Sequence, residues 1–371
     1  MVRVLHYIGL LQFGGSQSFV MEIYRKIDRS KLQFDFVTFP NEKSGFYDEI
    51  RNMGGKVFEA PQYNGKNHFE FVKWWNNFFD EHPEYKIVHL HVRSVATICI
   101  RIAHKYGCYA IAHSHSTSNG SGVAAMVKGV MQLPIRFQAD YLFACSDIAG
   151  KWLYGSNVGR SKKYKVIKNA IDAKRFDFDR EMRVAVRKSL HVEDKLVIGH
   201  VGRMTEAKNH FFLIDVFAEV IKKNENAVLL LIGDGELKGD IENKIAKEGL
   251  NNKIILLGSK NDTEKYYQAM DIFVFPSLWE GLGIVAIEAQ ASGLPCVVSD
   301  TIPKEIDINA GLIHVLKLSD ESEKWAQMIN SIDTVNRVGR FEEVKQSGYD
   351  VTENAKKMQR FYLKIAKRRG K

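Results

Sequence analysis

The sequence lacks a long apolar run, and it is poor in cysteine. None of its hydrophobic stretches approaches the roughly 18–20 residues that a membrane-spanning helix needs. The opening residues, MVRVLHYIGLLQFGGS, have neither a long hydrophobic region nor a small-residue cleavage site. The four cysteines are scattered without metal-ligand spacing, which indicates buried, reduced thiols rather than a disulfide framework. These absences predict a cytoplasmic protein.

Acidic residues are fewer than basic ones, 44 against 53, and the formal net charge is +9. Such a charge permits nucleic acid, an anionic membrane surface or a phosphorylated substrate as a partner. No zinc-finger, homeodomain or RRM signature accompanies it, so nucleic acid is not an expected partner.

The length and the hydrophobic pattern predict two domains. The chain has 371 residues, of which 45% are hydrophobic, and single cores stop growing near roughly 250–300 residues. Short apolar runs alternate with helix-length segments throughout, as in βαβ units. The fold class expected from this alternation is α/β, with two doubly wound Rossmann-like domains facing a central cleft.

The most informative stretch lies between residues 271 and 300 and reads DIFVFPSLWEGLGIVAIEAQASGLPCVVSD. Its pattern predicts a strand, a turn, a helix and a second strand, with Glu280 on the turn and Glu288 about two turns into the helix. A glycine-bearing turn before a helix leaves backbone N–H groups unpaired, which suits phosphate oxygens. Two ordinary surface glutamates are the commoner explanation for an arbitrary pair of this kind.

The string EGLGIVAIEAQASGLPCVVSD resembles the E-seven-E motif of family 4 of the retaining glycosyltransferases, which have the GT-B fold and include bacterial surface-polysaccharide enzymes. The resemblance implies that Glu280 contacts the transferred sugar and that Glu288 holds the ribose hydroxyls. It also implies that the turn of Gly281, Leu282 and Gly283 offers backbone N–H groups to the diphosphate.

The resemblance covers nearly the whole chain and is strongest from residue 196 to residue 300. The turn of Gly202 and Arg203, followed by Lys208, is similar to the family's phosphate clamp, so the two cations are the expected diphosphate ligands. Two further expectations follow from the family pattern. Gly14 and Gly15 match the turn that approaches donor phosphate and acceptor, and the loop with Lys260 and Asn261 would lie against the nucleobase.

Two histidines, His113 and His115, follow an apolar strand in the string HSHSTSNGSG. The carboxyl end of a strand in an open parallel sheet is where ligands bind. Metal binding is an alternative, but no acidic or cysteine partners are nearby in the sequence, and no metal is expected. The resemblance implies that one histidine approaches the donor sugar and phosphate, and both positions fit.

The string VIKNAIDAKRF resembles the family's hinge, although Ala170 stands where glycine is usual. We therefore expect an N-terminal acceptor-binding domain over residues 1–170 and a C-terminal nucleotide-sugar-binding domain over 171–351. A C-terminal helix of about 352–371 would pack back on the first domain. Residues 123–136 are either a packed helix or a membrane-facing acceptor helix, and with the basic amphipathic tail they suggest peripheral association with the inner face of an anionic membrane.

The resemblance implies retaining transfer of a hexosyl or N-acetylhexosaminyl unit from a nucleoside diphosphate sugar, expected to be a UDP-sugar, without metal or other cofactor. The expected acceptor is a hydroxyl of a glycan or lipid-linked molecule in capsule, exopolysaccharide or lipid-linked glycan synthesis. A non-catalytic nucleotide-sugar binder of the same fold is the first alternative. A nicotinamide-dependent oxidoreductase is disfavoured, because neither FGGSQS nor GDGELK gives the G-x-G-x-x-G fingerprint.

Overall fold

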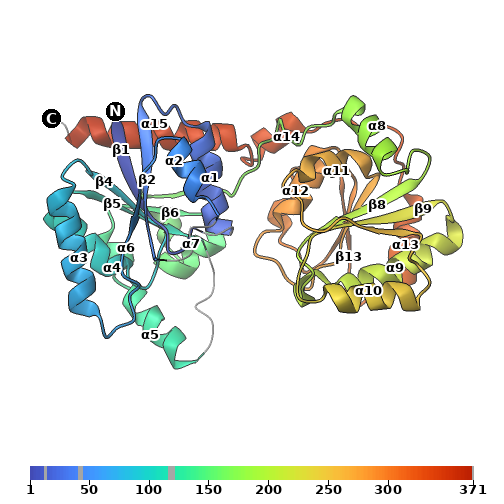
Figure 1. Cartoon of the computed structure of the whole chain (residues 1–371), viewed down its shortest axis with the longest axis horizontal. Coiled ribbons are helices and arrows are strands. Elements are labelled where there is room, and N and C mark those ends of the chain that lie inside the picture. Colours follow the sequence, from blue (N-terminus) through green and yellow to red (C-terminus); the bar gives the residue numbers. More distant parts are fainter. Residues whose placement is uncertain (12–14, 41–44, 116–121, 370–371) are drawn as a thin grey trace. The chain divides into compact units, whose positions relative to one another are not determined.

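The structure, a computed structural model, describes residues 1–11, 15–40, 45–115 and 122–369. The chain divides into two compact units (Figure 1). Unit 1 contains Met1–Ala170 and Val351–Lys371, and unit 2 contains Ile171–Asp350. The change from one unit to the other falls inside the string VIKNAIDAKRF.

Unit 1 is built on a parallel sheet of seven strands in the order β3-β2-β1-β4-β5-β6-β7. Its central strands are apolar and buried on both faces, which is typical of parallel sheets covered by helices on both sides. The strands are β1 (Val2–Tyr7), β2 (Leu32–Thr38), β3 (Val57–Glu59), β4 (Ile87–Leu90), β5 (Tyr109–Ser114), β6 (Tyr141–Ala144) and β7 (Tyr164–Val166).

Two layers of helices cover this sheet, each with its own hydrophobic core. One face carries α1 (Gly15–Lys26), α2 (Tyr47–Asn52) and the long C-terminal helix α15 (Val351–Arg369). The other face carries α3 (His68–Glu81), α4 (Ala96–Lys105), α6 (Ile135–Gln138) and α7 (Asp147–Tyr154), and α5 (Val123–Gln132) precedes α6.

Helix α15 returns to the first unit and lies beside α1 (Figure 1). Its residues Met358, Tyr362 and Ile365 are buried in the core under β1 and β4. The apolar face of the basic tail is therefore occupied by its own domain. These side chains pack against the sheet of unit 1.

Unit 2 has a six-stranded parallel sheet in the order β10-β9-β8-β11-β12-β13. The strands are β8 (Leu196–Val201), β9 (Ala227–Ile232), β10 (Ile254–Leu256), β11 (Ile272–Phe275), β12 (Cys296–Ser299) and β13 (Ile313–Leu316). One face is covered by α11 (Thr263–Ala269), α12 (Ile284–Ala291) and α14 (Phe341–Gln346), and the other by α9 (His210–Lys223), α10 (Lys238–Lys247) and α13 (Ser322–Ser331). Helix α8 (Arg180–Ser189) packs on α11.

Each sheet reverses its strand order between its first and fourth strands, which confirms the expected pair of doubly wound Rossmann-like domains. In unit 1 this switch point lies between β1 and β4, and in unit 2 between β8 and β11. At a switch point the loops that follow the two neighbouring strands leave in opposite directions, which opens a crevice at the carboxyl ends of the strands. In open α/β sheets this crevice is where ligands bind. No helix in the described part of the chain is both long and apolar enough to cross a membrane.

Candidate active site

The loops that follow β8 and β11 meet at the switch point of unit 2. Lys208 Nζ donates to Glu280 Oε1 at 2.5 Å. Two bonds fix the backbones around this pair: Leu278 N–H donates to the carbonyl of Ala207 at 2.8 Å, and Asn209 Nδ2 donates to the carbonyl of Pro276 at 3.2 Å. The two loops therefore form one braced structure.

The Lys208–Glu280 pair is largely withdrawn from water, with exposed side-chain fractions of 18% and 12%. Lys208 Nζ also lies 5.0 Å from the ring centroid of Phe275, the last residue of β11. Partial burial strengthens the attraction of such a cation for a second anion, because the effective dielectric constant is lower than that of water. The ammonium has three donors, so it can hold Glu280 and a phosphate oxygen together.

A glycine turn links Glu280 to α12. Within the described residues, the backbone N–H groups of Gly281, Leu282 and Gly283 have no hydrogen-bond acceptor. Gly283 has φ +85°, and a Cβ there would lie 3.0 Å from the Phe275 ring, so the turn requires glycine. Unpaired N–H groups at a helix start, where the macrodipole is positive, form a site for an anion.

Glu288 is the fifth residue of α12, a little over one turn from the helix start rather than the expected two. The hydroxyl of Tyr267 on α11 donates to its Oε2 at 2.8 Å. Tyr267 is buried, and burial, followed by the charge of Glu288, raises the pKa of its phenol well above the usual value. Tyr267 therefore stays a neutral donor that orients the carboxylate, a role with no recognisable signal in the sequence.

Gly202 lies directly after β8, and its lack of a side chain allows Lys208 to lie close to the end of the strand. A Cβ at this position would lie 3.0 Å from His200 Nε2 and 3.2 Å from Lys208 Cδ. Arg203 is exposed, and among the residues that the structure describes its side chain forms no ion pair. Lys208 is thus placed by packing, whereas Arg203 has its guanidinium available for a ligand.

Two buried histidines near Gly202 and Lys208, His200 and His210, were not singled out from the sequence. The His200 and His210 rings lie 4.8 Å apart, and His200 Nδ1 bonds to the carbonyl of Val274 at 2.9 Å. Burial, then the charge of Lys208, lowers the pKa of His210 to about 4. Burial also lowers the pKa of His200 well below its usual value. Both rings are therefore neutral near pH 7.

This depressed pKa predicts acid lability. The unfolded chain binds a proton at His210 below about pH 6.5, whereas the folded chain resists until about pH 4, so stability present above pH 6.5 is lost as the pH falls. Each pH unit in this window costs about 1.4 kcal/mol for the one ring. Denaturant unfolding of wild type and His210→Gln from pH 8 to 5 should show a shallower loss in the variant. Identical slopes of unfolding free energy against pH in the two proteins would contradict the prediction. The values at pH 8 are the reference, because His200 and His210 are neutral at that pH.

The other residues expected to bind the donor lie on other elements of the two units. Lys260 and Asn261 are exposed in the loop after β10, at the edge of the sheet, where the Asn261 carbonyl accepts from Arg175 Nη2 at 2.9 Å. Gly15 begins α1 in unit 1, and Gly14 lies outside the described residues. Their assigned roles stay predictions.

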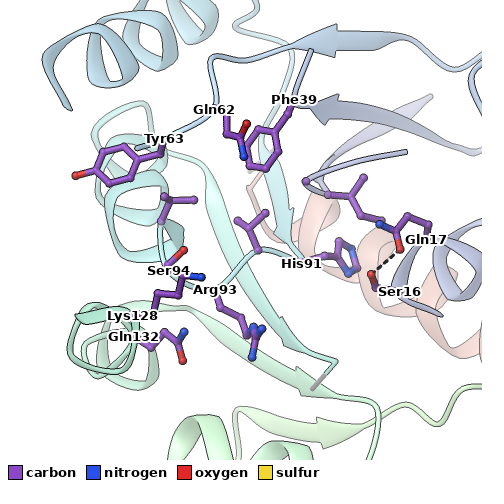
Figure 2. Close-up of a pocket in the computed structure, with 14 residues that line it drawn as sticks. Ser16, Gln17, Phe39, Gln62, Tyr63, His91, Arg93, Ser94, Lys128 and Gln132 are labelled. Atoms are coloured by element: carbon purple, nitrogen blue, oxygen red, sulfur yellow. Dashed lines mark hydrogen bonds between the residues drawn. The ribbon is translucent and has the colours of Figure 1, made fainter. Parts of the chain in front are cut away.

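Unit 1 has a pocket of about 410 Å³ at its own switch point, between the ends of β1 and β4 (Figure 2). Its wall combines two cations, Arg93 and Lys128, with polar side chains that include Ser16, Gln17 and Gln132. Unit 1, like unit 2, therefore has positively charged side chains at the carboxyl ends of its central strands. The chemistry of this pocket suits a polar, negatively charged ligand.

The predicted histidines His113 and His115 lie on β5 and directly after it, with ring centroids 4.0 Å apart. His113 is buried, and burial lowers the pKa of both rings, that of His115 to about 3. Three further histidines join them: His6 on β1, His89 on β4 and His91 directly after β4. Sequence reasoning missed this grouping, although alternate positions in the strings HLH and HSH share one face of their strands.

Two Rossmann-like units, the second with a phosphate-suited glycine turn beside a lysine, define the GT-B class of glycosyltransferases. Residues 182–332 match the model of the family described as glycosyl transferases group 1. Over 360 residues the chain is 34% identical to the "Putative glycosyltransferase EpsF" of Bacillus subtilis, covering 95% of this chain and 94% of that protein. The chain therefore belongs to the group 1 glycosyl transferases, and the resemblance seen in the E-seven-E string is confirmed.

Two further comparisons agree. The chain is 28% identical over 257 residues to the capsular polysaccharide biosynthesis glycosyltransferase CapM of Staphylococcus aureus, covering 66% of this chain and 67% of that one. The crystal structure of Anabaena Alr3699/HepE in complex with UDP covers 100% of both chains, with a TM-score of 0.72 and 18% identity. That likeness supports the GT-B fold. The protein is a glycosyltransferase, as expected, rather than an oxidoreductase.

Proposed function

We propose that this enzyme transfers a sugar from a UDP-sugar to a glycan or lipid-linked acceptor in bacterial surface-polysaccharide assembly, with retention at the anomeric carbon. The observation that carries the proposal is the braced pair Lys208–Glu280 beside the unpaired N–H groups of residues 281–283. A cation, a carboxylate and an anion-binding turn meet there at the switch point. The UDP complex of the HepE structure and the capsular role of CapM support the donor and the pathway class.

Each part of the site has a defined task in this proposal. Negative charge grows on the leaving diphosphate in the transition state, and Lys208, Arg203 and the turn N–H groups stabilise it. Glu280 contacts the sugar hydroxyls, and Glu288, oriented by Tyr267, holds the ribose. These roles need no metal ion bound to the diphosphate.

The pocket of unit 1 is the proposed acceptor site. Arg93 and Lys128 supply positive charge to a hollow that is otherwise lined by hydroxyl, amide and apolar groups. Such a wall suits the phosphate and first sugar of a lipid-linked acceptor. Lys128 belongs to α5, whose neighbouring positions are apolar and exposed, so the pocket opens beside a surface that suits lipid.

The direct test of the proposal is a screen of UDP- and GDP-sugars by thermal shift, followed by product analysis. A donor at 100 times its Kd should stabilise the protein by about 2.7 kcal/mol. NMR of the product made with that donor then reports the anomeric configuration, and an inverted product would refute the retaining assignment. Stabilisation by GDP-sugars alone would refute the UDP assignment.

The exposed face of α5 and α6 suggests how the enzyme reaches a lipid-linked acceptor. Met126 and Phe137 have exposed fractions of 71% and 72%. They are joined by Val127, Val130 and Leu133, each more than half exposed, and Arg136 lies among them. Large apolar side chains beside cations are typical of a helix that lies in a membrane interface. We infer that this face docks the enzyme on the inner surface of an anionic membrane.

Liposome flotation tests this docking. The wild type should float with anionic vesicles, because each cation near the surface contributes on the order of 1 kcal/mol, and salt should weaken the association. Val130→Asp should abolish flotation without changing the melting temperature, since the side chain is 63% exposed. Val184→Asp is the matched control, because that valine is 61% exposed on α8 of unit 2. Equal flotation of both variants would contradict the proposed face.

A further inference from the structure

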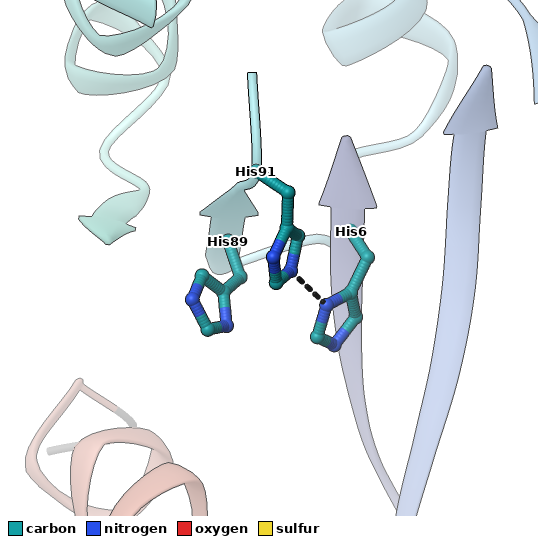
Figure 3. Close-up of side chains that lie close together, drawn as sticks. All are labelled: His6, His89 and His91. Atoms are coloured by element: carbon teal, nitrogen blue, oxygen red, sulfur yellow. Dashed lines mark hydrogen bonds between the residues drawn. The ribbon is translucent and has the colours of Figure 1, made fainter. Parts of the chain in front are cut away.

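Five histidines gather on one face of the unit 1 sheet, under α1 and α15. His6 lies on β1, His89 on β4 and His91 directly after it, with His113 and His115 beside them. His6 pairs with His89 in register across the two strands. Figure 3 shows the rings of His6, His89 and His91 next to one another. This group lies at the switch point, and His91 also lines the unit 1 pocket.

The rings contact one another rather than ordinary partners. His6 Nδ1 lies 3.0 Å from His91 Nε2, and His91 Nδ1 lies 2.8 Å from His115 Nε2. His89 Nδ1 lies 2.5 Å from the hydroxyl of Tyr362 on α15. Within the described residues, His6 Nε2 and His89 Nε2 are buried without a hydrogen-bond partner.

An unsatisfied buried nitrogen such as His89 Nε2 is costly unless a ligand binds it. Buried polar groups are normally hydrogen-bonded, and an unsatisfied one destabilises the fold. His6 and His89 have exposed fractions of 1% and 0%, and they lie among aromatic side chains such as Phe34. Neutral imidazoles collected in an apolar environment are the preferred ligands of zinc and related divalent ions.

We propose that His6, His89 and His91 bind one divalent transition-metal ion of the zinc class. One ring nitrogen of each lies within 4.8 Å of one ring nitrogen of each of the others. Zinc–nitrogen bonds of about 2.0–2.1 Å in a tetrahedron place neighbouring nitrogens about 3.4 Å apart. The His6–His91 separation of 3.0 Å needs only a small change to reach that value.

The surroundings of His89 and His91 fit the site, and His6 faces His91 with its Nδ1 atom. A ligating histidine usually holds its second nitrogen in a hydrogen bond that fixes the tautomer. His89 does so with Tyr362, and His91 does so with His115. His91 reaches the pocket wall, which gives an ion a path from solvent. Three protein ligands leave a fourth position for water or an anion.

The ion would couple the core of unit 1 to its pocket, because His91 belongs to both. This inference concerns unit 1 alone and does not rest on the proposed UDP-sugar chemistry of unit 2. An enzyme that transfers sugar but binds no zinc would overturn only the inference.

The test uses full-length protein without a polyhistidine tag, since a tag binds the same ions. After dialysis against a chelator, the protein is titrated with Zn²⁺ and, separately, with Co²⁺. We expect one ion per chain by elemental analysis, a visible d–d absorption band with Co²⁺, and a higher Tm with Zn²⁺. A wild type that takes up no stoichiometric ion overturns the proposal and leaves a hydrogen-bonded histidine chain.

Variants then locate the ion. His6→Gln, His89→Gln and His91→Gln should each weaken Zn²⁺ binding at least 100-fold, and Tyr362→Phe by about 10- to 100-fold. His68→Gln, on α3 of the same unit, is the matched control and should bind as wild type does. Loss of binding in His113→Gln with retention in His6→Gln would overturn the assignment. It would place the ion between His91, His113 and His115, whose ring nitrogens also approach within 4.8 Å of one another.

Discussion

Replacing Lys208 with alanine is expected to lower kcat by about 100- to 1000-fold, by analogy with the loss of one oxyanion-hole donor. The ammonium lies in a partly buried position beside the glycine turn, where it would bind the leaving diphosphate. Its contribution rises as the leaving group gains charge, so turnover should fall more than donor binding. Steady-state kinetics with the UDP-sugar donor measure the effect.

Arg203→Ala should act in the same direction, because the exposed guanidinium follows the strand end at Gly202. Arg203→Lys should restore only part of the rate, since a point charge does not reproduce a bidentate fork on phosphate. The variant Lys222→Ala is the matched control, because that lysine lies on α9, is 64% exposed and pairs with Glu219. Near-normal kcat in both Lys208→Ala and Arg203→Ala would remove the clamp from the mechanism.

One structural consequence of losing Lys208 needs its own control. Glu280 would keep its charge in a largely buried position without its partner, and this costs stability. The double variant Lys208→Ala/Glu280→Gln removes that charge. It should recover the melting temperature of the wild type but not its turnover, because it lacks both the Lys208 cation and the Glu280 carboxylate that contacts the sugar. Recovery of turnover would contradict the proposed roles of both Lys208 and Glu280.

The two glutamates are expected to separate catalysis from nucleotide binding. Glu288→Gln should weaken UDP binding by about 10- to 100-fold, because a hydrogen bond to a charged group contributes about 1.5–3 kcal/mol. Glu280→Gln should leave UDP binding nearly unchanged and lower kcat by a similar factor, since its contacts are with the sugar. Calorimetry with UDP and kinetics with the UDP-sugar measure the two effects.

Tyr267→Phe provides a check on the Glu288 assignment. The phenol orients the carboxylate at 2.8 Å from a buried position, and phenylalanine keeps the ring packing. UDP binding should weaken less than in Glu288→Gln but in the same direction. If Glu280→Gln weakened UDP and Glu288→Gln did not, the two roles would be exchanged.

The sequence by itself determined the local units of this protein. Apolar runs of four to six residues separated by helical spacing predict β8, β11 and their helices, because burial on both faces of a parallel sheet requires such runs. Glu280, the glycine turn and Glu288 lie within nine consecutive residues, so their order along a strand, turn and helix follows from the pattern alone. The family resemblance then supplied the roles.

Only the tertiary structure decided which distant groups meet. Lys208 reaches Glu280 across 72 positions, and His6 reaches His91 across 85. Tyr267 approaches Glu288 from a different helix, and α15 buries its apolar face on β1 and β4. The hydrophobic period of a strand fixes which face it buries, but it does not specify which strand lies beside it. The packing of each sheet decides which strands are neighbours. It thereby brings Lys208 into contact with Glu280 and brings the histidines of unit 1 together.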